Sequence, residues 1–130
     1  MIGALLILTA STGQLEESCD DPMTQLALNM CAYQDFQRAD AAMNAQWQRT
    51  VAVTKAADRE LARSPDNQPG YFATLLSAQR AWLTYRDQHC TSASFEARGG
   101  SMQPMLFSGC KARLTEERTK QLKELTEVEH

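Results

Sequence analysis

Two short segments rich in glycine and proline interrupt an otherwise helical pattern of apolar residues. "SPDNQPG" at 64–70 contains two prolines and a glycine, and "RGGSMQP" at 98–104 contains two glycines and a proline. Such segments end helices, because proline cannot continue one and glycine allows a sharp reversal. No alternating strand pattern and no internal repeat competes with this division. The sequence therefore predicts an all-α fold, an antiparallel three-helix bundle.

The three expected helices differ in length. They are predicted over about residues 23–63, 71–97 and 105–127. Asp21 can cap the first helix, and Pro22 suits its first position. That helix would extend ~60 Å, whereas the others would reach only ~40 and ~35 Å at the α-helical rise. We therefore expect the first helix to overhang its partners or to bend, and we place the bend at the β-branched cluster at 50–54.

Polar side chains share the inner stripes of these helices. In the second helix, Gln79 and Arg86 lie among leucines and a cysteine at helical spacing. Because an unpaired buried guanidinium costs several kcal/mol, an inward Arg86 must be paired. We predict a partly buried polar network of Asp40, Asn44, Gln79, Arg86 and Arg118. The same spacing assigns four aromatic side chains to the core, namely Tyr33, Trp47, Trp82 and Tyr85.

Such a network can fix the register of the helices or form a ligand site, and we favour the first interpretation. Proton transfer would need a second carboxylate or a histidine within reach of the network, and the spacing offers neither. The serines lack a histidine and aspartate in a suitable arrangement. No phosphate-binding loop, nucleotide-binding glycine pattern or metal-binding motif is present. The sequence predicts no catalytic residue, cofactor or metal site, and so no enzyme.

The four cysteines are Cys19, Cys31, Cys90 and Cys110. Zinc sites usually bring two ligands within a few residues of each other, and this chain has no such pair and no CxxC motif. Two disulfides in an oxidising compartment are therefore favoured over four buried thiols in the cytosol. The predicted bundle brings all four cysteines to one end. Three pairings are possible, and the similar heights of Cys31 and Cys90 weakly favour that pair.

Residues 1–18 precede a single predicted domain at 19–127. They begin with "MIGALLILTAST", an apolar stretch too short to span a bilayer. It is either the remnant of an export signal or an apolar arm that packs on the domain. The formal net charge of −3 and the absence of Lys/Arg runs argue against nucleic acid or an anionic membrane as the partner.

The connection between the second and third helices is the most distinctive loop. The candidate partner-binding loop consists of Arg98, Gly99, Gly100, Ser101, Met102 and Gln103. Its glycines permit a sharp reversal, so it can be presented to the cleft of a protein partner. The alternative, which the composition favours, is a plain connection in which the glycines only satisfy the turn geometry.

Several motifs in one order resemble a known family. "CDDPMTQLALNMC", "RADAAMNAQW", "LLSAQRAWLTYRDQHC", "GGSMQPM" and "CKARLTEERTKQL" together resemble the lysozyme inhibitor LprI-like domain of bacterial envelope proteins, from about Cys19 to Leu122. The chain departs from the family pattern at Met43 and Trp47, where leucine and tyrosine are usual. Its polar and aromatic signature is matched by Asp40, Asn44, Gln79, Arg80, Trp82, Arg86 and Asp87.

The resemblance implies export to the periplasm or secretion, disulfides, and a helical domain. It also implies a protein partner, a lysozyme for some members of the family, and an acidic domain suits a basic enzyme. The alternative is a structural or interaction module of the cell envelope that inhibits no enzyme.

Overall fold

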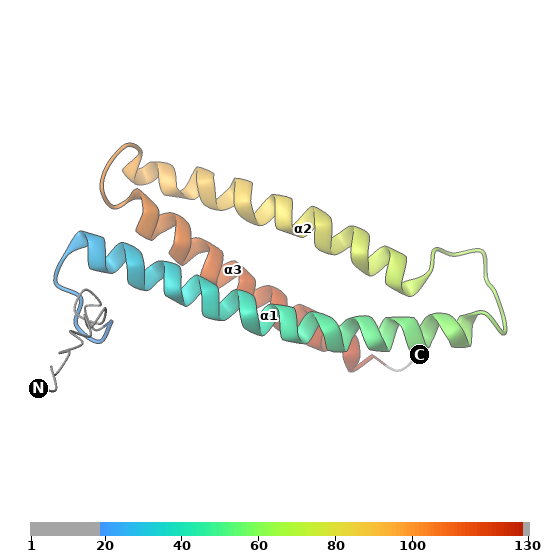
Figure 1. Ribbon diagram of the computed structural model, residues 1–130. Helices are drawn as coiled ribbons and strands as arrows, with labels where there is room; N and C mark the ends of the chain where they lie inside the picture. The colour runs from blue at the N-terminus through green and yellow to red at the C-terminus, as the bar shows by residue number, and fades with distance from the viewer. Residues whose placement is uncertain (1–18, 129–130) are drawn as a thin grey trace, which may run out of the picture.

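Three long helices make up the part of the chain that the computed structural model describes, residues 19–128 (Figure 1). They are α1 (Gln25–Leu61), α2 (Tyr71–Ser94) and α3 (Gln103–Thr126), and the short 3-10 helix η2 (Phe95–Ala97) follows α2. Within these residues there is no strand, and no helix is long and apolar enough to cross a membrane. The predicted all-α bundle is confirmed, and the apolar segment at 1–18 lies outside the described residues.

The helix α1 begins a few residues later than expected. Thr24 is its N-cap, and the Thr24 side-chain oxygen accepts a hydrogen bond of 3.1 Å from the backbone amide of Ala27. Pro22, which the sequence placed at the first helical position, therefore lies before the cap. The hydroxyl satisfies one of the backbone amides that have no partner inside the helix, which proline cannot do.

The β-branched cluster at 50–54 does not interrupt α1, which is one continuous helix. Thr50 is fully buried, and its hydroxyl oxygen lies 2.9 Å from the carbonyl oxygen of Leu122 in α3. The side-chain amide of Gln46 donates to the same hydroxyl at 3.2 Å. Contacts with α3 therefore outweigh the weak helix propensity at the site where we expected a bend.

The two shorter helices are offset along α1 and start near its opposite ends. At one end, the Asp58 carboxylate accepts hydrogen bonds from the backbone amides of Tyr71 and Phe72, at 2.6 and 3.1 Å. At the other end, the Asn29 side chain donates to the backbone carbonyl of Ser101 at 2.9 Å, just before α3 begins. The start of α2 and the start of α3 are thus held at opposite ends of the long helix.

The apolar core is small for a chain of this length. Its centre is Met43, Leu75 and Leu122, against which Trp47, Val51, Trp82 and Leu83 pack. The prediction that Tyr33 and Tyr85 belong to the core is wrong, since they are 51% and 55% exposed. Tyrosine tolerates this position because its phenol can remain in water.

All four cysteines form disulfides, as predicted, but the weakly favoured pairing of Cys31 with Cys90 is wrong. The pairs are Cys19–Cys31 and Cys90–Cys110. Asp40 faces α2, and Cys31 lies nine residues before it, which is two and a half turns of helix. Cys31 therefore faces away from α2 and towards the segment that leads into α1.

Removing the disulfides one at a time should cost different amounts of stability. Each disulfide closes a loop of the chain, and closing either loop contributes about 3 kcal/mol to the free energy of unfolding. Cys90 and Cys110 are buried, whereas Cys19 is exposed. Serines at 90 and 110 would bury two hydroxyls, so Cys90→Ser with Cys110→Ser should cost about 1–2 kcal/mol more than Cys19→Ser with Cys31→Ser. Urea unfolding of the two double variants measures the difference, and an equal or opposite ranking contradicts this account.

Candidate functional site

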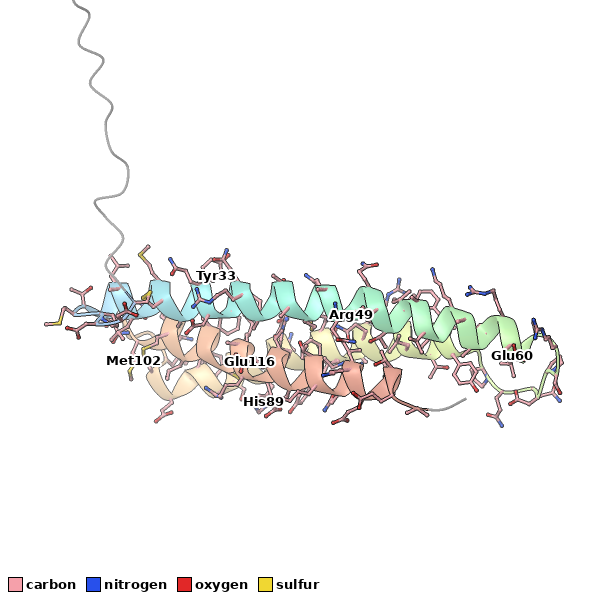
Figure 2. The ribbon with its side chains drawn as sticks, turned by 90° about the horizontal axis from the view of Figure 1, so that it is seen from below. Tyr33, Arg49, Glu60, His89, Met102 and Glu116 are labelled. Atoms are coloured by element: carbon pink, nitrogen blue, oxygen red, sulfur yellow. A yellow bond between two sulfur atoms is a disulfide. The ribbon has the colours of Figure 1, made fainter. Side chains whose placement is uncertain are left out.

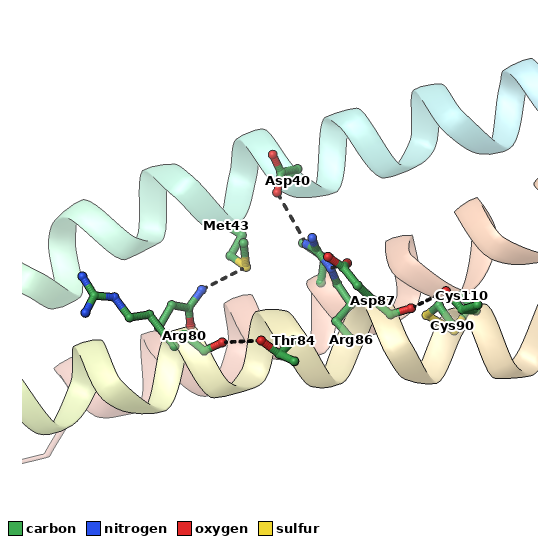
Figure 3. Close-up of polar contacts among 11 residues, drawn as sticks. Asp40, Met43, Arg80, Thr84, Arg86, Asp87, Cys90 and Cys110 are labelled. Carbon is green, nitrogen blue, oxygen red and sulfur yellow. Dashed lines mark hydrogen bonds and ion pairs between the residues drawn. A yellow bond between two sulfur atoms is a disulfide. The ribbon is translucent and has the colours of Figure 1, made fainter.

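Arg86 of α2 lies at the centre of a polar cluster that joins all three helices (Figure 3). Its side chain is 8% exposed. The Nε atom lies 3.0 Å from the carboxylate of Asp87, and Nη1 lies 3.7 Å from Asp40 of α1. The same Nη1 donates to the hydroxyl of Thr115 in α3 at 3.3 Å. The guanidinium therefore has charged partners on two helices and a neutral partner on the third, which offsets the cost of its burial.

Gln79, two turns before Arg86 on α2, forms a second set of contacts. Its side-chain amide nitrogen lies 3.6 Å from the sulfur of Met43 in α1 (Figure 3), and its side-chain oxygen accepts a hydrogen bond of 2.9 Å from Nε of Arg118 in α3. Burial lowers the pKa of Arg118 from its ordinary value. Arg118 also donates to the side chain of Gln121 at 3.1 Å. These contacts again connect α1, α2 and α3.

Asn44 lies at the exposed edge of the predicted, partly buried network. It is exposed, and its side-chain amide lies 3.4 Å from the Asp40 carboxylate. The neighbouring Met43 is the residue on this turn of α1 that faces Gln79. Asp35, about one and a half turns before Asp40 on α1, forms an exposed ion pair with Arg38 and takes no part in the cluster.

Cationic and aromatic side chains alternate along the interior and connect the two sets of contacts. We call this arrangement the cation–aromatic ladder. Its cations lie 4.0 to 5.9 Å from the ring centroids. Such contacts are worth about 1–2 kcal/mol when they are shielded from water. In order, the members are Phe107, Lys111, Phe36, Arg86, Trp82 and Arg118.

Lys111 is the member of the ladder that lies between two phenylalanines, 4.0 Å from the ring of Phe36 and 4.5 Å from the ring of Phe107. Burial lowers the pKa of the Lys111 ammonium from its ordinary value, Arg86 lowers it further, and Asp87 and Asp40 partly oppose the shift. Lys111 was not among the residues predicted for the network. The spacing of Phe107 and Lys111 on one face of α3 was visible, but their proximity to Phe36 depends on how α1 packs.

The groups of this cluster are occupied by one another. Among residues 19–128, every buried side-chain nitrogen or oxygen has a hydrogen-bond partner, and no three acidic, histidine or cysteine side chains are grouped to hold a metal ion. Arg86 is shared among two carboxylates and a hydroxyl, so it has little capacity left for a ligand. We propose that the cluster fixes the register of the three helices, in keeping with the first of the two interpretations of the network.

The loop at 98–103 is ordered by hydrogen bonds on both sides. Gly99 adopts φ of 77°, a left-handed conformation that glycine accepts without strain. Its backbone amide donates to the side-chain oxygen of Gln103 at 2.9 Å, and the amide of Gly100 donates to the carbonyl of Ala97 at 2.8 Å. The side-chain amide of Gln103 also contacts the Ser94 hydroxyl at 3.3 Å. The loop is therefore held in one shape.

Replacing Arg86 should destabilise the fold more than replacing an exposed arginine on the same helix. Arg86→Ala removes the contacts to Asp40 and Thr115, removes one of the two cations beside each of Phe36 and Trp82, and creates a cavity. We expect a loss of about 2–4 kcal/mol of unfolding free energy. Arg80→Ala is the matched control and should cost less than about 0.5 kcal/mol. Chemical denaturation of both variants measures the difference, and a loss below that of the control would show that the cluster contributes nothing.

Comparison with known proteins places this site in a family. No solved structure matches the chain. An uncharacterized protein of Rhizobium meliloti (strain 1021) is 48% identical over 118 residues, covering 91% of this chain and 85% of the relative. The family model described as lysozyme inhibitor LprI matches residues 16–122, a range that contains both disulfides, the Arg86 cluster and the 98–103 loop. The chain therefore belongs to the lysozyme inhibitor LprI family.

Proposed function

We propose that this protein is exported to the bacterial envelope or its surroundings, where it binds a lysozyme and inhibits it by direct protein–protein contact. The observation that carries this proposal is the family match, which extends over residues 16–122. It covers almost the whole described domain, so the function of the family is proposed for the folded unit and not for a fragment of it.

The cysteines support the proposed compartment. Both disulfides lie within the matched range, and no cysteine of the described residues is free. Disulfides persist in the periplasm and outside the cell, whereas cytosolic thiols are kept reduced. Because the apolar core is small, the two disulfides supply a larger share of the stability.

The interior supports a binding function over a catalytic one. The titratable groups between the helices are paired with one another and make contacts that hold the fold together. The full sequence carries a formal net charge of −3, which favours encounter with a basic enzyme. A protein that contacts an enzyme from outside is consistent with both observations.

Lysozyme assays test this function directly. The oxidised protein, exported by a bacterial host, should at micromolar excess abolish most of the cell-wall lysis by at least one of the chicken, goose and invertebrate lysozyme types. The same preparation after reduction and alkylation is the matched control and should not inhibit, because the structure depends on its disulfides. Full activity of all three enzyme types in the presence of the oxidised protein would refute the proposal.

A second candidate function, an envelope interaction module without an enzyme target, is favoured by one surface. Leu26, Met30 and Tyr33 are 70%, 44% and 51% exposed and lie at helical spacing along one stripe of α1. Apolar stripes with this spacing dock helices into the grooves of partner proteins. This function predicts that Met30→Glu abolishes co-purification with an envelope protein, that Gln48→Glu farther along α1 does not, and that no lysozyme is inhibited.

A further inference from the structure

The loop that joins α2 to α3 places one arginine at the end of the molecule where the disulfides lie (Figures 1 and 2). Arg98 is exposed, and its guanidinium lies 4.3 Å from the ring centroid of Phe95, which is itself 42% exposed. Within residues 19–128 no carboxylate lies within 4.0 Å of Arg98, whereas Arg38 and Arg63 each pair with an acidic neighbour. The charge of Arg98 is therefore available to a partner protein.

The backbone under Arg98 is fixed before any partner arrives. Hydrogen bonds from Gly99 to Gln103, from Gly100 to Ala97 and from Asn29 to Ser101 connect the loop to α3, η2 and α1. The disulfide Cys90–Cys110 ties the adjoining helices together. A loop that is already ordered loses little conformational entropy on binding, so its contacts contribute more of their energy to affinity.

The tip of the 98–103 loop projects into solvent, and apolar surface lies beside the charge of Arg98. A side-chain carbon added at Gly99 would meet no other atom within 4 Å, so this part of the loop stands clear of the helices. Met102, labelled at this end of the molecule in Figure 2, is 40% exposed. A concave site of about 490 Å³ adjoins the loop; it is lined by Thr91, Ser94, Gly99, Gly100, Gln103, Pro104 and Phe107. Arginine, aromatic and methionine side chains are enriched where protein interfaces concentrate their binding energy.

We propose that Arg98 enters the active-site cleft of the inhibited enzyme and pairs with a catalytic carboxylate there. This inference rests on the proposed function and names the chemistry of the contact. Lysozymes cleave glycans with carboxyl side chains that flank the scissile bond, so their clefts carry negative charge. A guanidinium can bind a carboxylate through two parallel hydrogen bonds. With Arg98 in the cleft, the loop occupies the space in which the glycan chain binds.

The first test compares inhibition constants for the lysozyme type that the wild-type protein inhibits most strongly. Arg98→Ala should raise the inhibition constant roughly ten- to hundredfold, the range expected for a central interface arginine. Arg98→Lys retains the charge and should recover part of the loss. Arg63→Ala, an exposed loop arginine at the opposite end of the rod, is the matched control and should stay within about twofold of the wild type. The wild-type protein should raise KM for the glycan and leave kcat unchanged.

The second test locates the contact on the enzyme. The affinities of the wild-type protein and of Arg98→Ala are measured for the same lysozyme with and without an amide in place of its catalytic carboxylate. If the Arg98 guanidinium contacts the catalytic carboxylate, the effects of the two substitutions are not additive. The loss of affinity caused by Arg98→Ala is then at least fivefold smaller with the amide enzyme than with the unmodified enzyme.

The outcomes separate this inference from the proposed function. If the wild-type protein inhibits and Arg98→Ala inhibits equally well, the role of Arg98 is refuted and lysozyme inhibition stands. Additive substitutions would likewise refute the proposed contact between Arg98 and the catalytic carboxylate. If the wild-type protein inhibits no lysozyme, the proposed function fails and this inference fails with it. Thermal unfolding of each variant checks that the fold is intact.

Discussion

The structure depends on a buried guanidinium in a bundle with few large apolar side chains. Arg86 contacts Asp40, Asp87 and Thr115, and its face lies against Phe36 and Trp82. Isolated charges are expensive to bury, so the helices must adopt the one arrangement in which these partners coincide. An interface made only of leucine side chains would tolerate a shift of one helix along another by one helical turn. We propose that the ion pair does not, and that it makes a sparse core compatible with a single well-defined packing.

The same arrangement prepares the end of the molecule where we place the partner contact. Cys90 lies one helical turn beyond Arg86, and its disulfide to Cys110 fixes α2 against α3 immediately before they are joined. The loop at 98–103 is therefore held between two immobilised helix ends and is tied to α1 through Asn29. On the proposed function, the interior polar residues contribute indirectly, by holding the helices that carry the loop, and recognition is assigned to exposed residues such as Arg98.

Much of the fold follows from local properties of the chain. Proline and glycine at 64–70 and 98–104 end the helices wherever those segments are placed, so the number of helices and their approximate bounds were predictable. An inward Arg86 demands a partner in any packing, and the predicted network included Asp40, which pairs with it. Four cysteines without metal-site spacing indicated disulfides. The family motifs were recognisable because they contain these same residues, namely Asp40, Arg86 and the four cysteines.

What the sequence by itself determined is therefore the helices, the oxidised cysteines and the need to neutralise Arg86. Only the tertiary structure decided which cysteines pair, that Asn44, Tyr33 and Tyr85 face solvent, and that Lys111 lies between Phe36 and Phe107. The physical reason is that periodicity gives the direction of a side chain about its own helix axis, whereas contacts between helices depend on their relative rotation and offset. Those two quantities are set by the whole interface at once, and no single segment of the sequence contains them.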